Sequence, residues 1–518
     1  MSCILNCFKK GIFFILAKIK RVVLQIPDKN GGLSKMRIIW IYLEYIDRFM
    51  PKNNTKFLIQ KLSLIKRNLL KLIFMNLMFK IKNYSNIEIT EKNWNSYIEL
   101  IYKLSSLNLS SKQKTKFVTN AIEILLYDAF YGRGVNSKDL AFKNIEKISE
   151  ILELENSKTT QNYILDCARY IFNISNTLPS LEVVDDRLNT FQLLAMERVS
   201  LMLGFISSSY LFKEKAREKN IQIFYAQDDK SANTIKNAFF SALEIGDMNT
   251  LKDVLEVAKR TIKNQKFVDT LDYLYQLFTK QNYRKAFSKL SNEYELEFSE
   301  FIKNKSVAIV APLPVKTLSG SLIDSHDYIL RMSTTSHPSY LDSQIYGSRT
   351  DIASINIADI QGSKIMKNGK SDISNDLKYL IFKNLDTTIL KNYKFHIPTI
   401  RKRTLYGRVY TLSGFLTHIP ELVLFLLGSG VSKISLFSMN FFMASSSYDK
   451  NYRSLPTAHT LYFMGDNLAS SHIYLKKLYD LGLIECDESA LEVISLSTKE
   501  YLENMENIYR DTIKKYNR

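Results

Sequence analysis

Ser413 and Gly414 are the residues whose types and position most directly suggest ligand chemistry. They end a loop and precede an apolar segment with a helical pattern. The first turn of a helix has backbone amides without intrahelical partners, and the helix dipole attracts anions there. A glycine also lets a ligand approach the backbone closely. The sequence therefore predicts a phosphate-binding helix start, with a serine cap on a buried helix as the alternative.

No comparable pattern indicates a metal site. The chain has four cysteines, Cys3, Cys7, Cys167 and Cys486, and apart from the terminal couple Cys3 and Cys7 their spacing is neither that of metal ligands nor that of a pair. After residue 300 there is also no Asp-x-Asp pair. We expect neither a metal nor another cofactor, and the unpaired cysteines favour a reducing, cytoplasmic location.

Short runs rich in Val and Ile after Lys305 predict the strands of an α/β domain. These runs cover 306–311, 328–332, 351–356, 378–383, 394–397 and 433–439. Helices are expected after Ser413 and after Asn467. In such sheets a ligand lies at the carboxyl ends of the strands, so the loops that follow the strands are where chemistry is expected.

The first 300 residues instead carry long helical patterns with few breakers. Six of the nine prolines and all six histidines lie after residue 300. A helical hairpin is predicted over 237–260, with its turn at Gly246 and Asp247 and a restart at Asn249 and Thr250. No fixed repeat is present, so three parts are expected: a basic amphipathic segment (1–80), an irregular helical domain (81–300) and the α/β domain (301–518).

The chain is strongly basic, with 71 Lys and Arg against 52 Asp and Glu and a net charge of +19. The basic residues are dispersed and form no continuous stripe, so no nucleic-acid partner is expected. Near the N-terminus, the apolar residues 11–16 are too few to span a membrane. Flanked by lysines, they predict a helix that lies on an anionic membrane surface or packs on its own domain. The first alternative implies peripheral attachment to the inner face of the membrane.

Two motifs in the α/β half resemble those of sialyltransferases. Residues 323–332 and 347–350 read IDSHDYILRM and GSRT, and they resemble the long nucleotide-binding motif of animal-type sialyltransferases, glycosyltransferase family twenty-nine. Residues 411–416 and 431–436 read TLSGFL and VSKISL, and they resemble the shorter motif shared with bacterial sialyltransferases of family forty-two. The resemblance covers about residues 300–490. It implies a Rossmann-like, GT-A-like α/β domain, here preceded by an all-α region.

The resemblance also implies an activity. Such enzymes transfer sialic acid from a CMP-activated donor to a glycan hydroxyl, with inversion and without a metal. Ser413 and Gly414 lie in the shorter motif, Arg331 lies near the end of the long one, and Asn356 fits a position for an amide near the nucleotide or sugar. A role at a strand end or in a turn is the alternative for Arg331 and Asn356.

A third match follows the last predicted strand. The bacterial family has an aromatic pair and, six positions later, a second tyrosine, and its two tyrosines hold the departing phosphate. Tyr448 keeps a hydroxyl that can donate to developing phosphate charge, whereas Phe442 lacks one.

The nucleotide site departs from the family pattern. Residues 311–314, APLP, stand where the family has a Gly-Asn pair, so Ala311 and Pro314 are expected at the nucleotide. A proline lacks a backbone donor and cannot replace a side-chain amide. Ser333 replaces an asparagine, which shortens an amide contact to a hydroxyl. The nucleotide preference is therefore open.

The general base also departs from the pattern. The family has a histidine at the start of a helix and an acidic residue five positions on, and the matching residues are Asn467 and His472. Asparagine cannot accept a proton at neutral pH, whereas histidine can. Three residues could replace the missing base: Asp466, His472 and, preferred here, His459, which resembles the histidine of another family motif.

Two hypotheses of different classes follow. The first is a glycosyltransferase that uses CMP-sialic acid or a related nonulosonate and a glycan acceptor to build a cell-surface glycan. The second is a catalytically inactive relative that binds a glycan or nucleotide and uses its helical region for interactions, which the changes at Pro312, Phe442 and Asn467 favour. A basic nucleic-acid-binding protein is a distant third.

Overall fold

The computed structural model describes most of the chain from Lys158 onwards and a few residues before it. The described residues are 145–146, 148–150, 152, 154, 157–171, 174–181, 183–228, 230–313, 315–332, 342–355, 377–382, 399–401, 411–414, 416–443 and 467–516. Phe142–Arg518 forms one compact unit. The predicted N-terminal amphipathic helix and the predicted strand at 394–397 lie outside the described residues.

The described part of the first 300 residues is helical, as the sequence predicts. Its helices are α7 (Lys158–Ile171), α8 (Thr190–Met202), α9 (Ile206–Ala226), α10 (Ala232–Ile245), α11 (Met248–Thr261), α12 (Gln265–Phe278), α13 (Tyr283–Ser288) and α14 (Glu293–Ile302). The hairpin predicted over 237–260 is confirmed as α10 and α11. Gly246 ends α10 with a left-handed φ of 95°, and the Asp247 side chain caps α11 by accepting from the Thr250 amide at 3.0 Å. The cap is therefore Asp247 and neither Asn249 nor Thr250.

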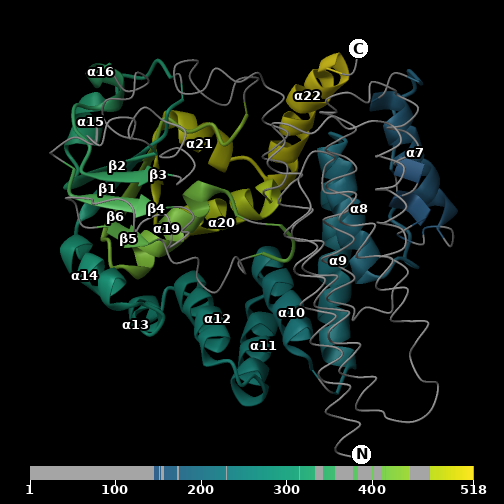
Figure 1. Ribbon diagram of the computed structural model, residues 1–518, viewed down its shortest axis with the longest axis horizontal. Helices are drawn as coiled ribbons and strands as arrows, with labels where there is room; N and C mark the ends of the chain where they lie inside the picture. The colour runs from purple at the N-terminus through teal and green to yellow at the C-terminus, as the bar shows by residue number, and fades with distance from the viewer. Residues whose placement is uncertain are drawn as a thin grey trace, which may run out of the picture. The chain divides into compact units, whose positions relative to one another are not determined.

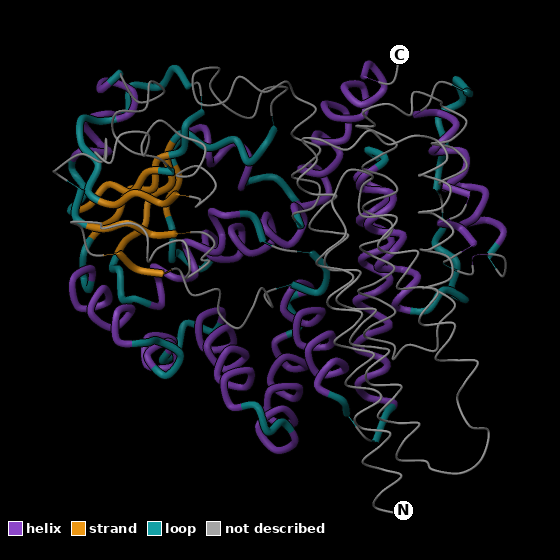
Figure 2. Tube along the Cα trace, viewed as in Figure 1, coloured by secondary structure: helices purple, strands orange, loops and turns teal. Residues whose placement is uncertain are grey.

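The second half of the described chain contains a parallel sheet (Figure 2). Its strands are β1 (Ser306–Val310), β2 (Tyr328–Arg331), β3 (Ile352–Ile355), β4 (Tyr379–Phe382), β5 (Thr399–Arg401), β6 (Lys433–Phe437) and β7 (Glu485–Cys486). Among the described residues they form one seven-stranded sheet in the order β5-β4-β3-β2-β1-β6-β7, and every pair is parallel. This confirms an α/β fold after a helical region. The chain extends the sheet to one side as far as β5 and then returns to the other side of β1 with β6.

Both faces of the central strands are covered, which explains why these strands are almost continuously apolar. On one face Ile323 of α15 (Gly320–Asp324) and Tyr346 of α16 (Ser343–Tyr346) pack into a cluster with side chains of β1, β2 and β6. Helix α19 (His418–Gly428) is buried from Pro420 to its end, as expected of a helix whose residues, apart from Glu421, are almost all apolar.

The helical region packs directly on the α/β region (Figure 1). Phe425 of α19 contacts the rings of Phe287 on α13 and Phe298 on α14, at centroid distances of 5.8 and 5.6 Å. The Tyr273 hydroxyl of α12 donates to the Leu424 carbonyl of α19. The change from helices to strands near residue 301 therefore lies inside one compact unit.

Three further helices complete the described chain: α20 (Leu468–Asp480), α21 (Glu488–Ile494) and α22 (Thr498–Tyr516). Helix α20 starts directly after Asn467, as the sequence predicts. Helix α22 runs back to the helical region and packs against α9 and α7. In the part of the chain that the structure describes, no helix combines the length and apolar character needed to cross a membrane.

Candidate functional site

The strand order reverses between β1 and β6, and their carboxyl ends lie side by side. The Ala311 amide, just after β1, donates to the Phe437 carbonyl at the end of β6 at 3.1 Å. Crevices at such switch points are the usual ligand sites of open α/β sheets. Ala311, predicted to contact a nucleotide, is 7% exposed and uses its own N–H within the sheet. Its amide is therefore not available to a ligand.

The loop after β6 holds an unusual backbone conformation. Ser438, Phe441 and Phe442 have φ values of 56°, 46° and 73°. A non-glycine residue in this left-handed region costs on the order of 1–3 kcal/mol and persists only where its surroundings hold it. The hydroxyls of Tyr501 and Tyr509 on α22 donate to the carbonyls of Phe441 at 2.7 Å and Phe442 at 2.6 Å. Helix α22 thus fixes this strained loop.

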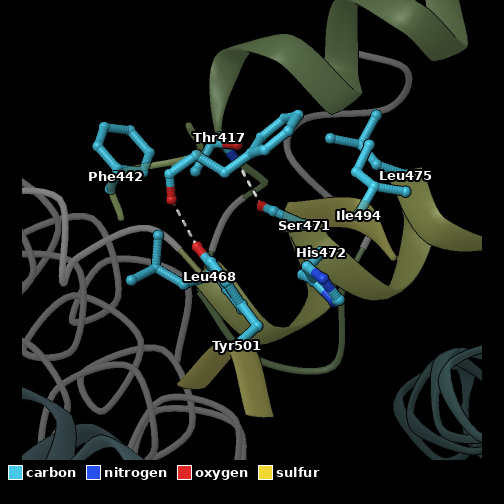
Figure 3. Close-up of a pocket in the computed structure, with 9 residues that line it drawn as sticks. Thr417, Phe442, Leu468, Ser471, His472, Leu475, Ile494 and Tyr501 are labelled. Carbon is cyan, nitrogen blue, oxygen red and sulfur yellow. Dashed lines mark hydrogen bonds between the residues drawn. The ribbon is translucent and has the colours of Figure 1, made fainter. Parts of the chain in front are cut away.

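A small cavity lies beside this loop (Figure 3). It is lined by Thr417, Phe441, Phe442, Leu468, Ser471, His472, Leu475, Ile494 and Tyr501. The Thr417 amide donates to the Ser471 hydroxyl at 2.9 Å, which joins the start of α19 to α20. The cavity measures about 10 Å³, room for about one water molecule. A nucleotide sugar needs several hundred Å³, so this cavity by itself does not hold one.

Asn467, which the sequence resemblance matched to a catalytic histidine, links α20 to α9 and to the 411–414 loop. It is 3% exposed and caps α20 by accepting from the Ser470 amide at 2.9 Å. Its carboxamide oxygen also accepts from Lys213 Nζ at 2.8 Å, and its nitrogen donates to the Ser413 carbonyl at 2.5 Å. Both ends of the carboxamide are therefore bound inside the protein.

Lys213 belongs to a buried cluster of four charged side chains from α8, α9 and α10. Lys213, Arg217, Glu197 and Glu244 are 0%, 3%, 6% and 4% exposed. Glu244 Oε2 lies 3.0 Å from Arg217 Nε and 3.3 Å from Lys213 Nζ, and Glu197 Oε1 lies 3.8 Å from Lys213 Nζ. Two cations and two anions balance, as buried charges require.

The pKa values of this cluster reflect a balance of burial and pairing. Burial lowers the pKa of Lys213, and the two nearby carboxylates oppose this only in part. Burial alone would raise the pKa of Glu244, but Lys213 and Arg217 outweigh it, so the net pKa of Glu244 is lowered. Glu244 is therefore held as a carboxylate.

Ser413 is hydrogen-bonded to the buried charge cluster. Its hydroxyl donates to Glu197 Oε2 at 2.5 Å, and the Thr411 hydroxyl donates to the carbonyls of Ser413 at 2.9 Å and Gly414 at 3.0 Å. The helix that the sequence places here begins only at His418. Ser413 and Gly414 therefore do not form the predicted helix start, because the side chains of Thr411 and Asn467 fold them into a loop. Gly414 is exposed, with a φ of 66°.

His472, a predicted base, is fixed between helices. It is 3% exposed and stacks on Tyr501 with ring centroids 4.5 Å apart. Its Nε2 lies 3.2 Å from the Val493 carbonyl and its Nδ1 3.0 Å from the Thr498 hydroxyl. Burial lowers the pKa of His472 to about 4. A neutral ring donates from Nε2 and accepts at Nδ1, so neither nitrogen is open to an acceptor hydroxyl, which argues against a role as base.

Arg331, a predicted nucleotide contact, is 1% exposed and forms hydrogen bonds to the loop before β3. Its guanidinium donates to the Thr350 hydroxyl at 2.8 Å and to the Tyr346 carbonyl at 2.5 Å. Asp324, in the same motif, accepts from the Ser348 amide at 2.8 Å. In the described residues the long motif thus holds its own two segments together.

Six further predicted site residues lie outside the described residues. These are His459, Tyr448 and Asp466 among the catalytic candidates and Pro314, Ser333 and Asn356 among the nucleotide contacts. The described residues contain no group of three His, Cys, Asp or Glu side chains arranged to hold a metal ion.

The buried charge cluster was not predicted, although the sequence of α9 carries a signal for it. Lys213 and Arg217 fall in register with the apolar residues Phe212, Ala216 and Phe224 on the buried side of α9. Charged residues at helical spacing within an apolar stripe indicate buried ion pairs, because an unpaired buried charge is too costly.

Comparison of the sequence with models of protein families finds no match, and comparison with curated proteins finds none either. Residue types and geometry are therefore what support a function for this chain.

Proposed function

We propose that this chain is a sialyltransferase-type glycosyltransferase that transfers sialic acid or a related nonulosonate from a CMP-activated donor to a glycan hydroxyl. One observation carries the proposal: segments that resemble separate sialyltransferase motifs meet around one cavity. Thr417 directly follows the TLSGFL motif, Phe441 and Phe442 form the aromatic pair, and Leu468 and His472 follow the position of the family's base. These segments are far apart in the sequence, and they line the same cavity.

The sheet supports the same proposal. A parallel sheet whose order reverses between β1 and β6 is what a Rossmann-like, GT-A-like nucleotide-sugar domain would use. The cavity lies beside the strained loop after β6. Because the cavity is too small for the donor, the proposed donor site is larger than this cavity.

The proposed reaction needs a base other than Asn467 or His472. We assign this role to His459, with Asp466 as the next candidate. The base takes the proton of the acceptor hydroxyl, the hydroxyl oxygen attacks the anomeric carbon of the donor, and CMP leaves from the opposite face. Tyr448 donates a hydrogen bond to the phosphate as its negative charge develops.

The test is release of CMP by the full-length protein supplied with CMP-sialic acid and a panel of glycan acceptors. We expect His459→Ala to lower kcat by about 10²–10⁴-fold. Tyr448→Phe should lower it by about 10²-fold. The control is Tyr294→Phe, because Tyr294 is 64% exposed on α14. Absence of CMP release with every donor and acceptor would remove the claim of catalysis.

A second candidate is a non-catalytic protein that binds a nucleotide or glycan. The connections of Asn467 to Lys213 and Ser413 favour it, because the position of the family's base serves as a structural link. Calorimetry of the full chain with CMP, UDP and GDP separates the candidates. Selective CMP binding without turnover would support the second candidate, whereas turnover would exclude it.

A further inference from the structure

The carboxamide of Asn467 can be placed in two orientations that exchange its oxygen and nitrogen. An ammonium group has only donors, so Lys213 requires the oxygen of Asn467 to face it. The Ser470 amide makes the same demand from the start of α20. The nitrogen of Asn467 must then face the other way, where it meets the carbonyl and the hydroxyl of Ser413 at 2.5 and 3.2 Å. Lys213 and the Ser470 amide together determine which end of Asn467 reaches the 411–414 loop.

Lys213 also takes part in hydrogen bonds and ion pairs that connect α8, α9, α10 and α20. Lys213 Nζ donates to the Ser470 hydroxyl at 2.6 Å, and that hydroxyl donates to Glu244 Oε1 at 2.6 Å. At the opposite end, the Ser413 hydroxyl donates to Glu197, which also lies near Lys213 Nζ. The loop is therefore attached to the helical region at two points, through Asn467 and through Glu197.

We propose that Lys213 is a positioning residue of the candidate donor site, acting through Asn467 to hold the 411–414 loop. That this loop belongs to a donor site rests on the proposed function. The helical region then supplies part of the site, in addition to any role it has in binding a partner. Buried ion clusters often contribute no more to folding stability than apolar packing of the same volume would. We therefore assign this cluster the role of holding the loop in one specific geometry.

A purely structural role makes a different prediction. A residue that only stabilises the unit would, when removed, increase local opening everywhere. A residue that positions the loop would act on residues 411–417 and on the start of α20, while β1 and β6 keep their protection. Amide hydrogen exchange of the full chain distinguishes these two patterns.

The principal variant is Lys213→Met combined with Glu197→Gln, which removes one buried charge of each sign. It is compared with Glu197→Gln alone, so that the effect of Lys213 is separated from that of the bond between Ser413 and Glu197. We expect the amides of 411–417 to exchange about tenfold faster and CMP to bind about tenfold more weakly, which corresponds to about 1.4 kcal/mol. Lys215→Met is the matched control, because Lys215 lies on the same helix and pairs with Asp186 and Glu218 at the surface. It should leave both measurements unchanged.

Asn467→Asp provides a second variant in case the first does not fold. An aspartate can still accept from Lys213 and from the Ser470 amide, but it cannot donate to Ser413. Faster exchange at 411–417 is therefore expected here too. In the Asn467→Ala background, adding Lys213→Met should cause no further increase at 411–417, because the two residues act in series.

The outcomes separate the two proposals. Unchanged exchange at 411–417 in these variants, or an equal increase in β1 and β6, would overturn the positioning role of Lys213. If the wild-type protein bound no CMP, the proposed function would lose support, and the exchange pattern would still decide the role of Lys213.

Discussion

Glu244→Gln should strongly destabilise the compact unit. The Glu244 side chain is buried, and its Oε2 lies 3.0 Å from Arg217 Nε and 3.3 Å from Lys213 Nζ. Glutamine keeps the size and shape of the side chain but removes its charge. Lys213 would then keep its longer pairing with Glu197, at 3.8 Å, and Arg217 would lose its ion pair with Glu244 at 3.0 Å. Leaving a buried charge uncompensated costs about 3–5 kcal/mol, which is the loss of stability that we expect.

The pH dependence of this loss follows from the pKa of Glu244. Burial raises it, but Lys213 and Arg217 outweigh burial, so the pKa in the folded protein lies below its ordinary value of 4.5. A lowered pKa contributes stability that is present above the unfolded pKa and is lost as pH falls through the folded pKa. Glutamine does not titrate. The gap in stability between wild type and variant should therefore narrow as pH falls below 4.5.

Urea unfolding of the full chain, followed by circular dichroism, measures this gap. Glu218→Gln is the matched control, because Glu218 is 57% exposed and pairs with Lys215 at the surface. Its unfolding midpoint should match that of the wild type. A Glu244→Gln midpoint indistinguishable from wild type would refute the reasoning, since the cluster would then tolerate an unbalanced positive charge.

Three further predictions concern other parts of the chain. Burial lowers the pKa of His472 to about 4 from 6.5, so the folded protein should lose on the order of 3 kcal/mol of stability as pH falls through this window. His472→Gln should remove this pH dependence, which urea unfolding at several pH values measures. An unchanged pH dependence of stability in the variant would show that His472 is not its source. Gly428→Ala should lower the stability of the protein by about 1–3 kcal/mol, because its Cβ would lie 2.3 Å from the Phe287 ring. Adding Phe287→Leu should recover part of this loss. An unchanged thermal unfolding temperature in Gly428→Ala would show that α13 moves aside easily. Removal of about the first 25 residues should abolish sedimentation with anionic vesicles, because it deletes the predicted basic amphipathic helix; equal sedimentation of the full and shortened chains would discard membrane attachment through this segment.

The sequence predicted the local elements well where periodicity or capping decides them. The predicted strands at 306–311, 328–332, 351–356, 378–383 and 433–439 correspond to β1, β2, β3, β4 and β6, with ends shifted by one or two residues. The strands β5 and β7 were not predicted. They have only three and two residues, too short to show an apolar run.

The candidate site was less predictable, because its contacts join distant parts of the chain. The resemblance indicated both Asn467 and Ser413, but it did not predict that their side chains are hydrogen-bonded to each other. Arg331 and His472 were predicted to meet substrate or nucleotide, and the structure shows both bound to neighbouring loops and helices. Residue type alone does not distinguish a buried, satisfied histidine or arginine from one open to a ligand.

The sequence by itself determined that a helical region precedes an α/β region, because helix and strand periodicity are local properties of the chain. Only the tertiary structure decided what Asn467 does. Its partner Lys213 lies 254 positions away, on a helix whose pattern does not indicate which element it will meet. The balance of the buried charges likewise depends on α8, α9, α10 and α20 coming together, since a side chain's pKa and hydrogen-bond partners are set by what surrounds it in space.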